Sequence, residues 1–257
     1  MIAPDEVSRL PPYAGGMTGI DTRVARDAEH LAREAAEVIA GTIEADPHAA
    51  LVVAAGDTPQ PAYRELATHV ATGLDVSRIR VFQLDDYAGI AHDDRRSLFA
   101  WLMRGFVEPL GVEPEQVTRF DGAATDLEVS CRRYEADVAD AGGFDLAILG
   151  LGPNGHLGFN EPPSDRRAPT RPVELSTESV ASNANYWGGE DQVPRRAVTA
   201  GMDLLLAARR IVLIVSGAHK RSILAQALDG PIEPSVPASY LQEHHDVVVL
   251  TDRNARP

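Results

Sequence analysis

Short apolar runs that alternate with amphipathic segments constrain the fold of this chain more than any other feature. Continuous apolar runs of this kind are typical of buried strands in a parallel sheet. We predict strands at residues 50–54, 79–84, 144–152, 211–217 and 245–252, and helices at 22–45, 59–71, 96–109 and 219–228. Strands that alternate with helices predict one α/β domain over residues 1–257, with a doubly wound, mostly parallel sheet flanked by helices.

One long segment, from about residue 162 to 194, interrupts this alternation. It contains prolines at 162, 163, 169, 172 and 194 and arginines at 166, 167 and 171. Long segments without regular structure inside a compact domain are usually functional. We interpret the segment as a lid over an active site, and a surface excursion is the alternative.

Composition excludes several classes of function. The formal net charge of -14 disfavours binding to the phosphates of nucleic acids. The single cysteine, Cys131, lies in a charged run typical of a solvated helix and has no neighbour that would activate it. The first 20 residues are rich in proline and glycine and predict an irregular lead-in, without the pattern of a signal peptide. No apolar stretch is long enough to span a membrane, so we expect a soluble protein of the reducing cytoplasm.

The turn after the first predicted strand has the features of an anion site. Ligands of doubly wound folds bind beyond the carboxyl ends of the strands, and residues 54–60 read A-A-G-D-T-P-Q there. Gly56 allows a tight turn that presents backbone N–H groups at a helix start, and Thr58 adds a hydroxyl donor. Asp57 would oppose an anion if it faced inward, and the alternative is that it caps the helix.

Two adjacent carboxylates, Asp85 and Asp86, follow the second predicted strand in the sequence Q-L-D-D-Y. Neighbouring residues of a strand point to opposite faces, so only one of them can enter a given pocket. A partly desolvated carboxylate at a strand end is suited to act as a general base. A helix cap or a surface loop is the alternative reading.

The sequence G-L-G-P-N-G-H-L-G-F-N-E-P, residues 150–162, is the most informative motif. Its glycines permit tight turns and a close approach of the backbone to a ligand. Histidine is a side chain that can move protons near neutral pH, which makes His156 a candidate proton carrier, and Glu161 can orient its ring. We therefore predict that both residues are functional.

A further strand end carries S-G-A-H-K, residues 216–220, in which Lys220 is placed to meet a phosphate as a point charge. A surface lysine is the alternative. The histidines have no partners at metal-ligand spacing. The dinucleotide fingerprint and the nucleophile elbow of serine hydrolases are also missing from the sequence. We therefore predict neither a metal nor another cofactor.

The order of G-D-T-P, L-D-D-Y, G-P-N-G-H-L-G-F-N-E-P, V-P-R-R-A-V-T-A-G and S-G-A-H-K resembles the glucosamine-6-phosphate deaminases, from about residue 25 to 252. The related 6-phosphogluconolactonases and some sugar-binding regulatory domains share the fold, but they continue differently after the Gly-His pair. The resemblance implies an isomerase that releases ammonia from an amino-sugar phosphate without a cofactor.

The resemblance also implies roles for individual residues. Asp85 corresponds to the base that moves a proton between C2 and C1, and His156 corresponds to the group that opens the sugar ring, with Glu161 as its partner. Asn154 stands where many members carry an aspartate, and Asp86 replaces a usual glutamate. The substrate and phosphate contacts implied are Gly56, Asp57, Thr58, Asp86, Gly155, Asn185 and Lys220.

Two of these positions depart from the family pattern. Asp57 stands where the phosphate turn usually has a small neutral residue, and Asn185 aligns with an arginine that grips the phosphate. We therefore expect the 6-phosphate to contribute less to binding than in typical members. The alternatives are an enzyme for a different sugar, a 6-phosphogluconolactonase, or a sugar-sensing module without catalysis. The expected partner is a small amino-sugar phosphate, and the sequence is compatible with a monomer or a homo-oligomer.

Overall fold

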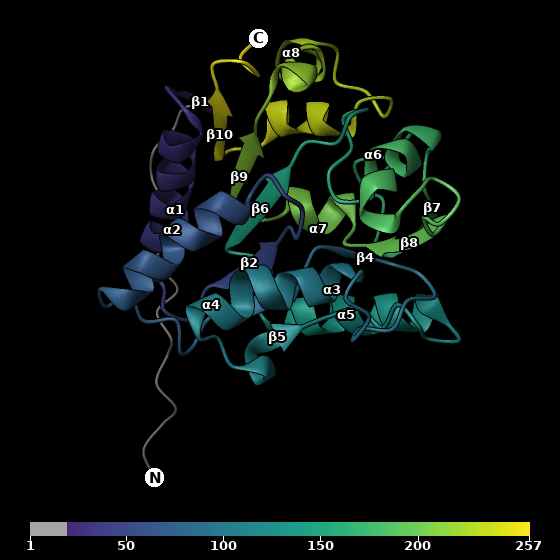
Figure 1. The fold of residues 1–257 in the computed structure, drawn as a ribbon, viewed down its shortest axis with the longest axis horizontal. Coiled ribbons are helices and arrows are strands. Elements are labelled where there is room, and N and C mark those ends of the chain that lie inside the picture. Colours follow the sequence, from purple (N-terminus) through teal and green to yellow (C-terminus); the bar gives the residue numbers. More distant parts are fainter. Residues whose placement is uncertain (1–19) are drawn as a thin grey trace.

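Residues 20–257 are described by a computed structural model, in which helices cover both faces of a central sheet (Figure 1). The strands are β1 (Ile20–Ala25), β2 (Ala50–Val53), β3 (Arg80–Gln83), β4 (Asp85–Tyr87), β5 (Val117–Thr118), β6 (Leu146–Gly150), β7 (Arg171–Glu174), β8 (Arg196–Thr199), β9 (Arg210–Val215) and β10 (Val247–Asp252). The α-helices are α1 (Ala28–Ala45), α2 (Gln60–Ala71), α3 (Leu98–Leu102), α4 (Glu108–Leu110), α5 (Leu127–Asp140), α6 (Thr177–Trp187), α7 (Met202–Leu206) and α8 (Arg221–Asp229). Shorter helical turns are η1 (Met103–Val107), η2 (Pro114–Gln116), η3 (Ala218–Lys220) and η4 (Pro237–Glu243). The predicted irregular lead-in lies outside the described residues, except for Ile20, which begins β1.

The large sheet confirms the predicted parallel architecture. Its strand order is β1-β10-β9-β6-β2-β3-β5, and all of its neighbouring pairs are parallel. From β2 the chain first adds β3 and β5 on one side, and it then adds β6, β9 and β10 on the other. Ligands of open α/β sheets bind where the direction of winding reverses. This rule places the expected site beyond the carboxyl ends of β2 and β6.

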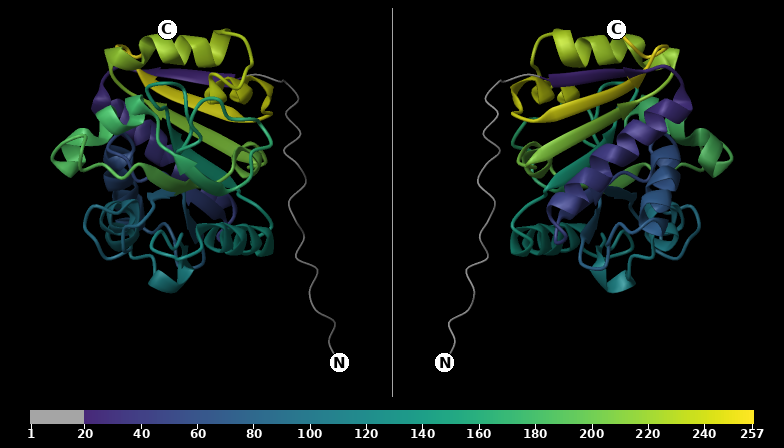
Figure 2. Two further views of the ribbon diagram at one scale, coloured as in Figure 1. Left: turned by 90° about the vertical axis from the view of Figure 1, so that its right-hand side faces the viewer. Right: turned by 90° about the vertical axis from the view of Figure 1, so that its left-hand side faces the viewer.

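Helices cover both faces of this sheet because each central strand is apolar on both sides. Leu51 and Val53 of β2 pack with α1 and α2, whereas Ala50 and Val52 of the same strand pack with α5, α7 and α8. Successive side chains of a strand point to opposite faces, so a continuous apolar run fills two cores. Figure 2 shows α1 and α2 side by side on one face in its right-hand view.

The start of the first predicted helix was wrong. Residues 22–25 belong to β1, and the helix begins only after Asp27, whose side chain accepts a hydrogen bond from the backbone N–H of His30 at 2.8 Å. Ile20 to Ala25 pair in parallel with β10 at the other end of the chain. Most side chains of this edge strand are exposed, so it lacks the continuous apolar run from which the central strands are predicted.

The helix that carries Cys131 was predicted to be solvated, and this too needs correction. Cys131, Tyr134 and Val138 of α5 are buried against the sheet, while the charged residues of the run face outward. Burial raises the pKa of the Cys131 thiol to about 11. The thiol is therefore protonated at neutral pH.

A second, smaller sheet was not predicted. It has the order β4-β8-β7 and is antiparallel, with Asp85 of β4 opposite Thr199 of β8. Helix α6 packs on it, and the rings of Tyr87 and Trp187 lie 5.0 Å apart between their centroids. The predicted lid, residues 162–194, thus contains β7 and α6 instead of irregular chain. Its function as a lid stays a prediction.

Candidate active site

A cavity of about 190 Å³ lies where the winding of the sheet reverses. Its wall is built from the turn after β2, from β4, from the glycine-rich loop after β6, from α6 and from the turn after β9. Five residues that the sequence indicated line it: Gly56, Thr58, Asp85, His156 and Lys220. Four separate segments therefore bring predicted residues to one place.

Asp85 presents its carboxylate to this cavity from the first position of β4. The residue is 8% exposed, and within residues 20–257 no group donates a hydrogen bond to its carboxylate; only its backbone oxygen accepts one, from Gln83 Nε2 at 2.9 Å. Burial, together with the negative charge of Asp86, raises the pKa of Asp85 to about 8. A desolvated carboxylate without donors binds protons avidly and suits a general base.

Asp86 points away from the cavity, which does not support its predicted contact with substrate. Its carboxylate accepts hydrogen bonds from Gln83 Nε2 at 2.8 Å, from its neighbour Tyr87 N at 2.8 Å, and from Leu98 N and Phe99 N at 2.9 and 3.2 Å. Burial raises the pKa of Asp86, and these donors oppose the rise. The side chain joins β4 to the start of α3, because adjacent residues of a strand face opposite sides.

His156 and Glu161 form a hydrogen-bonded pair within the loop after β6. His156 Nδ1 lies 3.3 Å from Glu161 Oε2 and 3.4 Å from Ser179 Oγ. Burial raises the pKa of Glu161, but the hydrogen bond and charge of His156, with hydrogen bonds from Ser179 and Asn154, outweigh it and bring the pKa to about 2. The carboxylate is therefore ionised at neutral pH and holds the proton of His156 on Nδ1.

Asn154 connects this pair to α6. Its Nδ2 donates to Glu161 Oε2 at 2.9 Å and to Ser176 Oγ at 3.2 Å, while its Oδ1 accepts from the backbone N–H of His156 at 3.3 Å. Ser176 caps the N-terminus of α6. Asn154 thus fixes Glu161 from behind the cavity and does not itself line it.

Two glycines allow His156 and Asp85 to approach the loop closely. A Cβ atom on Gly152 would lie almost equally close to Cδ2, Nε2 and Cγ of His156, so the face of the ring rests directly on the backbone of a residue that lines the cavity. Gly158 has a φ of +59°, and a Cβ there would lie 2.8 Å from Thr199 Oγ1 and 3.4 Å from Asp85 Oδ2. A side chain at either position would displace a predicted catalytic group.

Among the residues that line the cavity, Lys220 is the one with a cationic side chain. Its Nζ donates to the backbone oxygen of Leu151 at 2.7 Å, and burial lowers its pKa. The preceding turn is anchored by Asp252, whose Oδ2 accepts from Ser216 Oγ at 2.7 Å and from Gly217 N at 3.0 Å. A lysine on such a fixed turn can meet a phosphate as a point charge.

Three further predicted contacts, Asp57, Gly155 and Asn185, do not line the cavity. Oδ2 of Asp57 accepts a hydrogen bond from the hydroxyl of Tyr186 outside the cavity, so the aspartate neither faces inward nor caps α2. Gly155 forms a turn with a φ of +85°, where a Cβ would meet Val236. Asn185 is exposed on α6.

The sequence analysis missed the contribution of α6. Ser179, Ser182 and Asn183 line the cavity from this helix. Their spacing of three and four residues places them on one helix face, and this is the signal that could have found them. Asn185 lies two residues beyond Asn183 and therefore points to a different side. The prolines of residues 162–194 favour irregular chain, and they lie before and after α6 but not within it.

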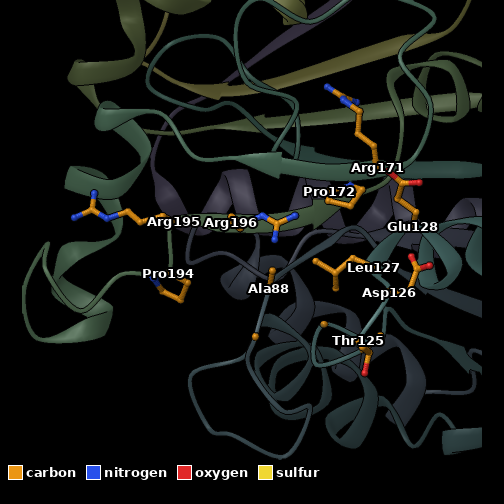
Figure 3. Close-up of a pocket in the computed structure, with 13 residues that line it drawn as sticks. Ala88, Thr125, Asp126, Leu127, Glu128, Arg171, Pro172, Pro194, Arg195 and Arg196 are labelled. Carbon is orange, nitrogen blue, oxygen red and sulfur yellow. The ribbon is translucent and has the colours of Figure 1, made fainter.

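A larger hollow of about 980 Å³ lies on another part of the surface (Figure 3). Arg195 and Arg196 reach it from the side of β8, and Asp126 and Glu128 reach it from the start of α5. It contains neither Asp85 nor the His156 pair, and it mixes both signs of charge. The smaller cavity is therefore the better candidate for the active site.

Within residues 20–257, no cluster of three or more histidine, cysteine or acidic side chains could hold a metal ion. In the same part of the chain, no helix is both long and apolar enough to cross a bilayer.

The chain is similar to known proteins over nearly its whole length. Residues 24–250 match the family model of the glucosamine-6-phosphate isomerases and 6-phosphogluconolactonases. A glucosamine-6-phosphate deaminase of Bacillus velezensis is 38% identical over 90% of this chain and 96% of its own, and one of a Thermoanaerobacter species is 35% identical over 88% and 90%.

Solved structures extend the comparison. The structure of a monomeric glucosamine-6-phosphate deaminase has a TM-score of 0.89 and is 37% identical, covering 92% of this chain and 98% of its own. A 6-phosphogluconolactonase of Trypanosoma brucei has a TM-score of 0.74 at 19% identity, covering 92% and 97%, and shares the fold. On the family match and these identities, the chain belongs to the family of glucosamine-6-phosphate isomerases and 6-phosphogluconolactonases.

Proposed function

We propose that the chain is a glucosamine-6-phosphate deaminase, which converts glucosamine 6-phosphate and water to fructose 6-phosphate and ammonia. The observation that carries the proposal is one cavity lined both by Asp85, a buried carboxylate without donors, and by His156, whose Nδ1 is paired with Glu161 behind the cavity. Relatives named glucosamine-6-phosphate deaminase, which match nearly the whole chain, support it.

Ring opening is the step that we assign to His156. Glu161 keeps the ring proton on Nδ1. The free lone pair is therefore on Nε2, at the other side of a ring that lines the cavity. Nε2 takes the proton from the hydroxyl on C1 and returns a proton to the ring oxygen as the bond between C1 and that oxygen breaks. The product is the open-chain aldehyde, with no net change in the protonation of the protein.

Isomerisation is the step that we assign to Asp85. Its carboxylate removes the proton from C2 and delivers it to C1. The oxygen on C1 takes up a proton and the nitrogen on C2 releases one, so C1 becomes the primary alcohol of the ketose and C2 becomes an imine. Water adds to C2, and ammonia leaves from it. Because C1 is reduced as C2 is oxidised, the rearrangement balances without an external oxidant. The raised pKa of Asp85 lets the same group take up and hold the proton between the two transfers.

Phosphate recognition is assigned to the turn after β2 and to Lys220. Gly56 and Thr58 present N–H and hydroxyl donors just before α2, and Lys220, which lines the same cavity, supplies the charge. Ser182 and Asn183 of α6 add neutral donors. With one cation among the residues that line the cavity, we expect the 6-phosphate to be recognised but not to dominate binding.

Ammonia release from glucosamine 6-phosphate and from glucosamine tests the proposal directly. Release from the phosphorylated sugar, with fructose 6-phosphate formed in equal amount, is the expected result. Hydrolysis of 6-phosphogluconolactone is measured in parallel. Lactone hydrolysis without ammonia release would replace the proposal with a lactonase, and binding of the amino sugar without turnover would indicate a sensing module.

A further inference from the structure

We infer that the hydroxyl of Ser179 is a positioning residue for His156, because it shares the Nδ1 proton with Glu161 and so holds the imidazole ring with Nε2 toward the cavity. Its kinetic consequence depends on the proposed function, whereas its effect on the ring does not. No signal for this role was recognised in the sequence.

The inference starts from the surroundings of His156 Nδ1. This atom lies between two oxygens, Glu161 Oε2 at 3.3 Å and Ser179 Oγ at 3.4 Å. Ser179 is fully buried in the wall of the cavity. A hydroxyl can accept one hydrogen bond while it donates another. Ser179 Oγ therefore accepts from Nδ1–H beside Glu161 Oε2, and its hydroxyl helps to lower the pKa of Glu161.

Ser179 is itself held firmly enough to act in this way. It lies in the first turn of α6, where its backbone N–H donates to the capping Ser176 Oγ at 3.1 Å. Ser176 is tied in turn to Asn154 Nδ2 at 3.2 Å, and its own N–H lies 3.4 Å from Glu161 Oε1. The start of α6 and the His156 loop are thus one hydrogen-bonded unit, so the hydroxyl has a fixed position relative to the ring.

The charged groups around His156 show that Ser179 acts on the position of the ring and not on the charge around it. Glu161 faces the ring from the same loop, and Asp85 of β4 and Lys220 after β9 line the same cavity. Helix α6 contributes neutral groups to this wall, namely Ser179, Ser182 and Asn183. Removing the Ser179 hydroxyl therefore leaves the charges facing His156 unchanged. It removes one of the two acceptors that favour the Nδ1–H tautomer and the observed ring orientation.

The test compares Ser179→Ala with Ser179→Thr, which keeps the hydroxyl, and with the control Thr177→Ala, an exposed hydroxyl in the same helical turn. Nitrogen-15 NMR of the imidazole rings reports the tautomer of His156, assigned by the loss of its signals in His156→Gln. We expect the Nδ1–H tautomer in the wild type, Ser179→Thr and Thr177→Ala, and a mixture of tautomers in Ser179→Ala. Ser179→Cys, nearly isosteric but a weaker partner, replaces the alanine variant if that one does not fold.

The kinetic arm uses the cyclic substrate and an open-chain analogue. We expect Ser179→Ala to lower kcat/KM about tenfold on the cyclic sugar, as the loss of one hydrogen bond would, and to leave the open-chain analogue nearly unchanged. An unaltered tautomer in Ser179→Ala, or equal losses on both substrates, would overturn the inference. Absence of ammonia release by the wild type would instead refute the proposed function, and the NMR result would still decide the role of Ser179.

Discussion

The hydroxyl of Tyr186, near the end of α6, donates a hydrogen bond to Oδ2 of Asp57, in the turn before α2, at 2.5 Å. The same ring packs edge-on against Trp101, with 5.1 Å between the ring centroids. These contacts turn the Asp57 carboxylate away from the cavity. They explain how an acidic residue can stand beside Gly56 and Thr58 in a turn suited to an anion.

Loss of the Tyr186 hydroxyl should weaken binding of the phosphorylated substrate. In Tyr186→Phe, Asp57 loses its partner and can rotate toward the cavity, where its charge repels the phosphate. We expect KM for glucosamine 6-phosphate to rise by about three- to tenfold, the range of one hydrogen bond, with KM for glucosamine unchanged. The double variant Tyr186→Phe with Asp57→Asn should restore the wild-type KM. A double variant as weak as the single one would contradict this explanation.

Asp85→Asn should abolish most of the turnover while the protein stays folded. A general base contributes roughly 10²–10⁴-fold to a rate, and kcat should fall by at least that factor. Because Asp85 must be ionised to accept the C2 proton, wild-type kcat/KM should decrease as the pH falls below about 8, the pKa that burial and Asp86 produce. A profile of kcat/KM against pH measures this decrease. If kcat/KM of Asp86→Asn decreases at the same pH as that of the wild type, Asp86 does not influence the pKa of Asp85.

The same raised pKa predicts an effect on stability. In the folded state the Asp85 carboxyl group keeps its proton up to about pH 8, whereas in the unfolded chain it loses the proton near pH 3.8. The free energy of unfolding therefore falls as the pH rises between these values. Above pH 8 the buried charge carries its full cost, and Asp85→Asn should be more stable than the wild type by on the order of 1–4 kcal/mol. Urea unfolding at several pH values measures this, with the exposed Asp140→Asn as the control that should show no gain.

Gly158→Ala should reduce activity more than stability. The new methyl group would press on Thr199 Oγ1 and Asp85 Oδ2, and the φ of +59° is unfavourable for alanine. We expect kcat to drop by about 10²-fold, as misplacement of a catalytic group by an ångström can cause. Gly41→Ala is the control, since a Cβ on this helical glycine of α1 meets nothing within 4 Å. It should leave kcat unchanged and raise stability by about 0.5–1 kcal/mol.

Lys220→Gln should separate phosphate recognition from chemistry. We expect KM for glucosamine 6-phosphate to rise at least about tenfold, as loss of a charge-assisted contact implies, while KM for glucosamine changes little. Asn185→Arg, suggested by the family pattern, should not lower KM, because this residue is exposed on α6 and lies outside the cavity lining. Tighter binding in Asn185→Arg would show that α6 rotates when substrate binds.

Much of the fold could be predicted because short apolar runs in the sequence indicate the buried strands. Apolar runs such as residues 50–54 fill both cores of a parallel sheet, and this pattern needs no knowledge of distant contacts. The small sheet could not be predicted in the same way. Its strands are short, and the strand that pairs with β4 is β8, far along the chain.

The sequence by itself determined the winding of the sheet and, through the motifs at its strand ends, the place where Asp85, His156 and Lys220 meet. Only the tertiary structure decided which polar side chains face that cavity. Asp86 turns to cap α3, Asp57 turns to Tyr186, and α6 presents Ser179 in place of Asn185. The physical reason is that the direction of a side chain depends on the partners that its hydrogen bonds and packing find, and those partners lie on other segments.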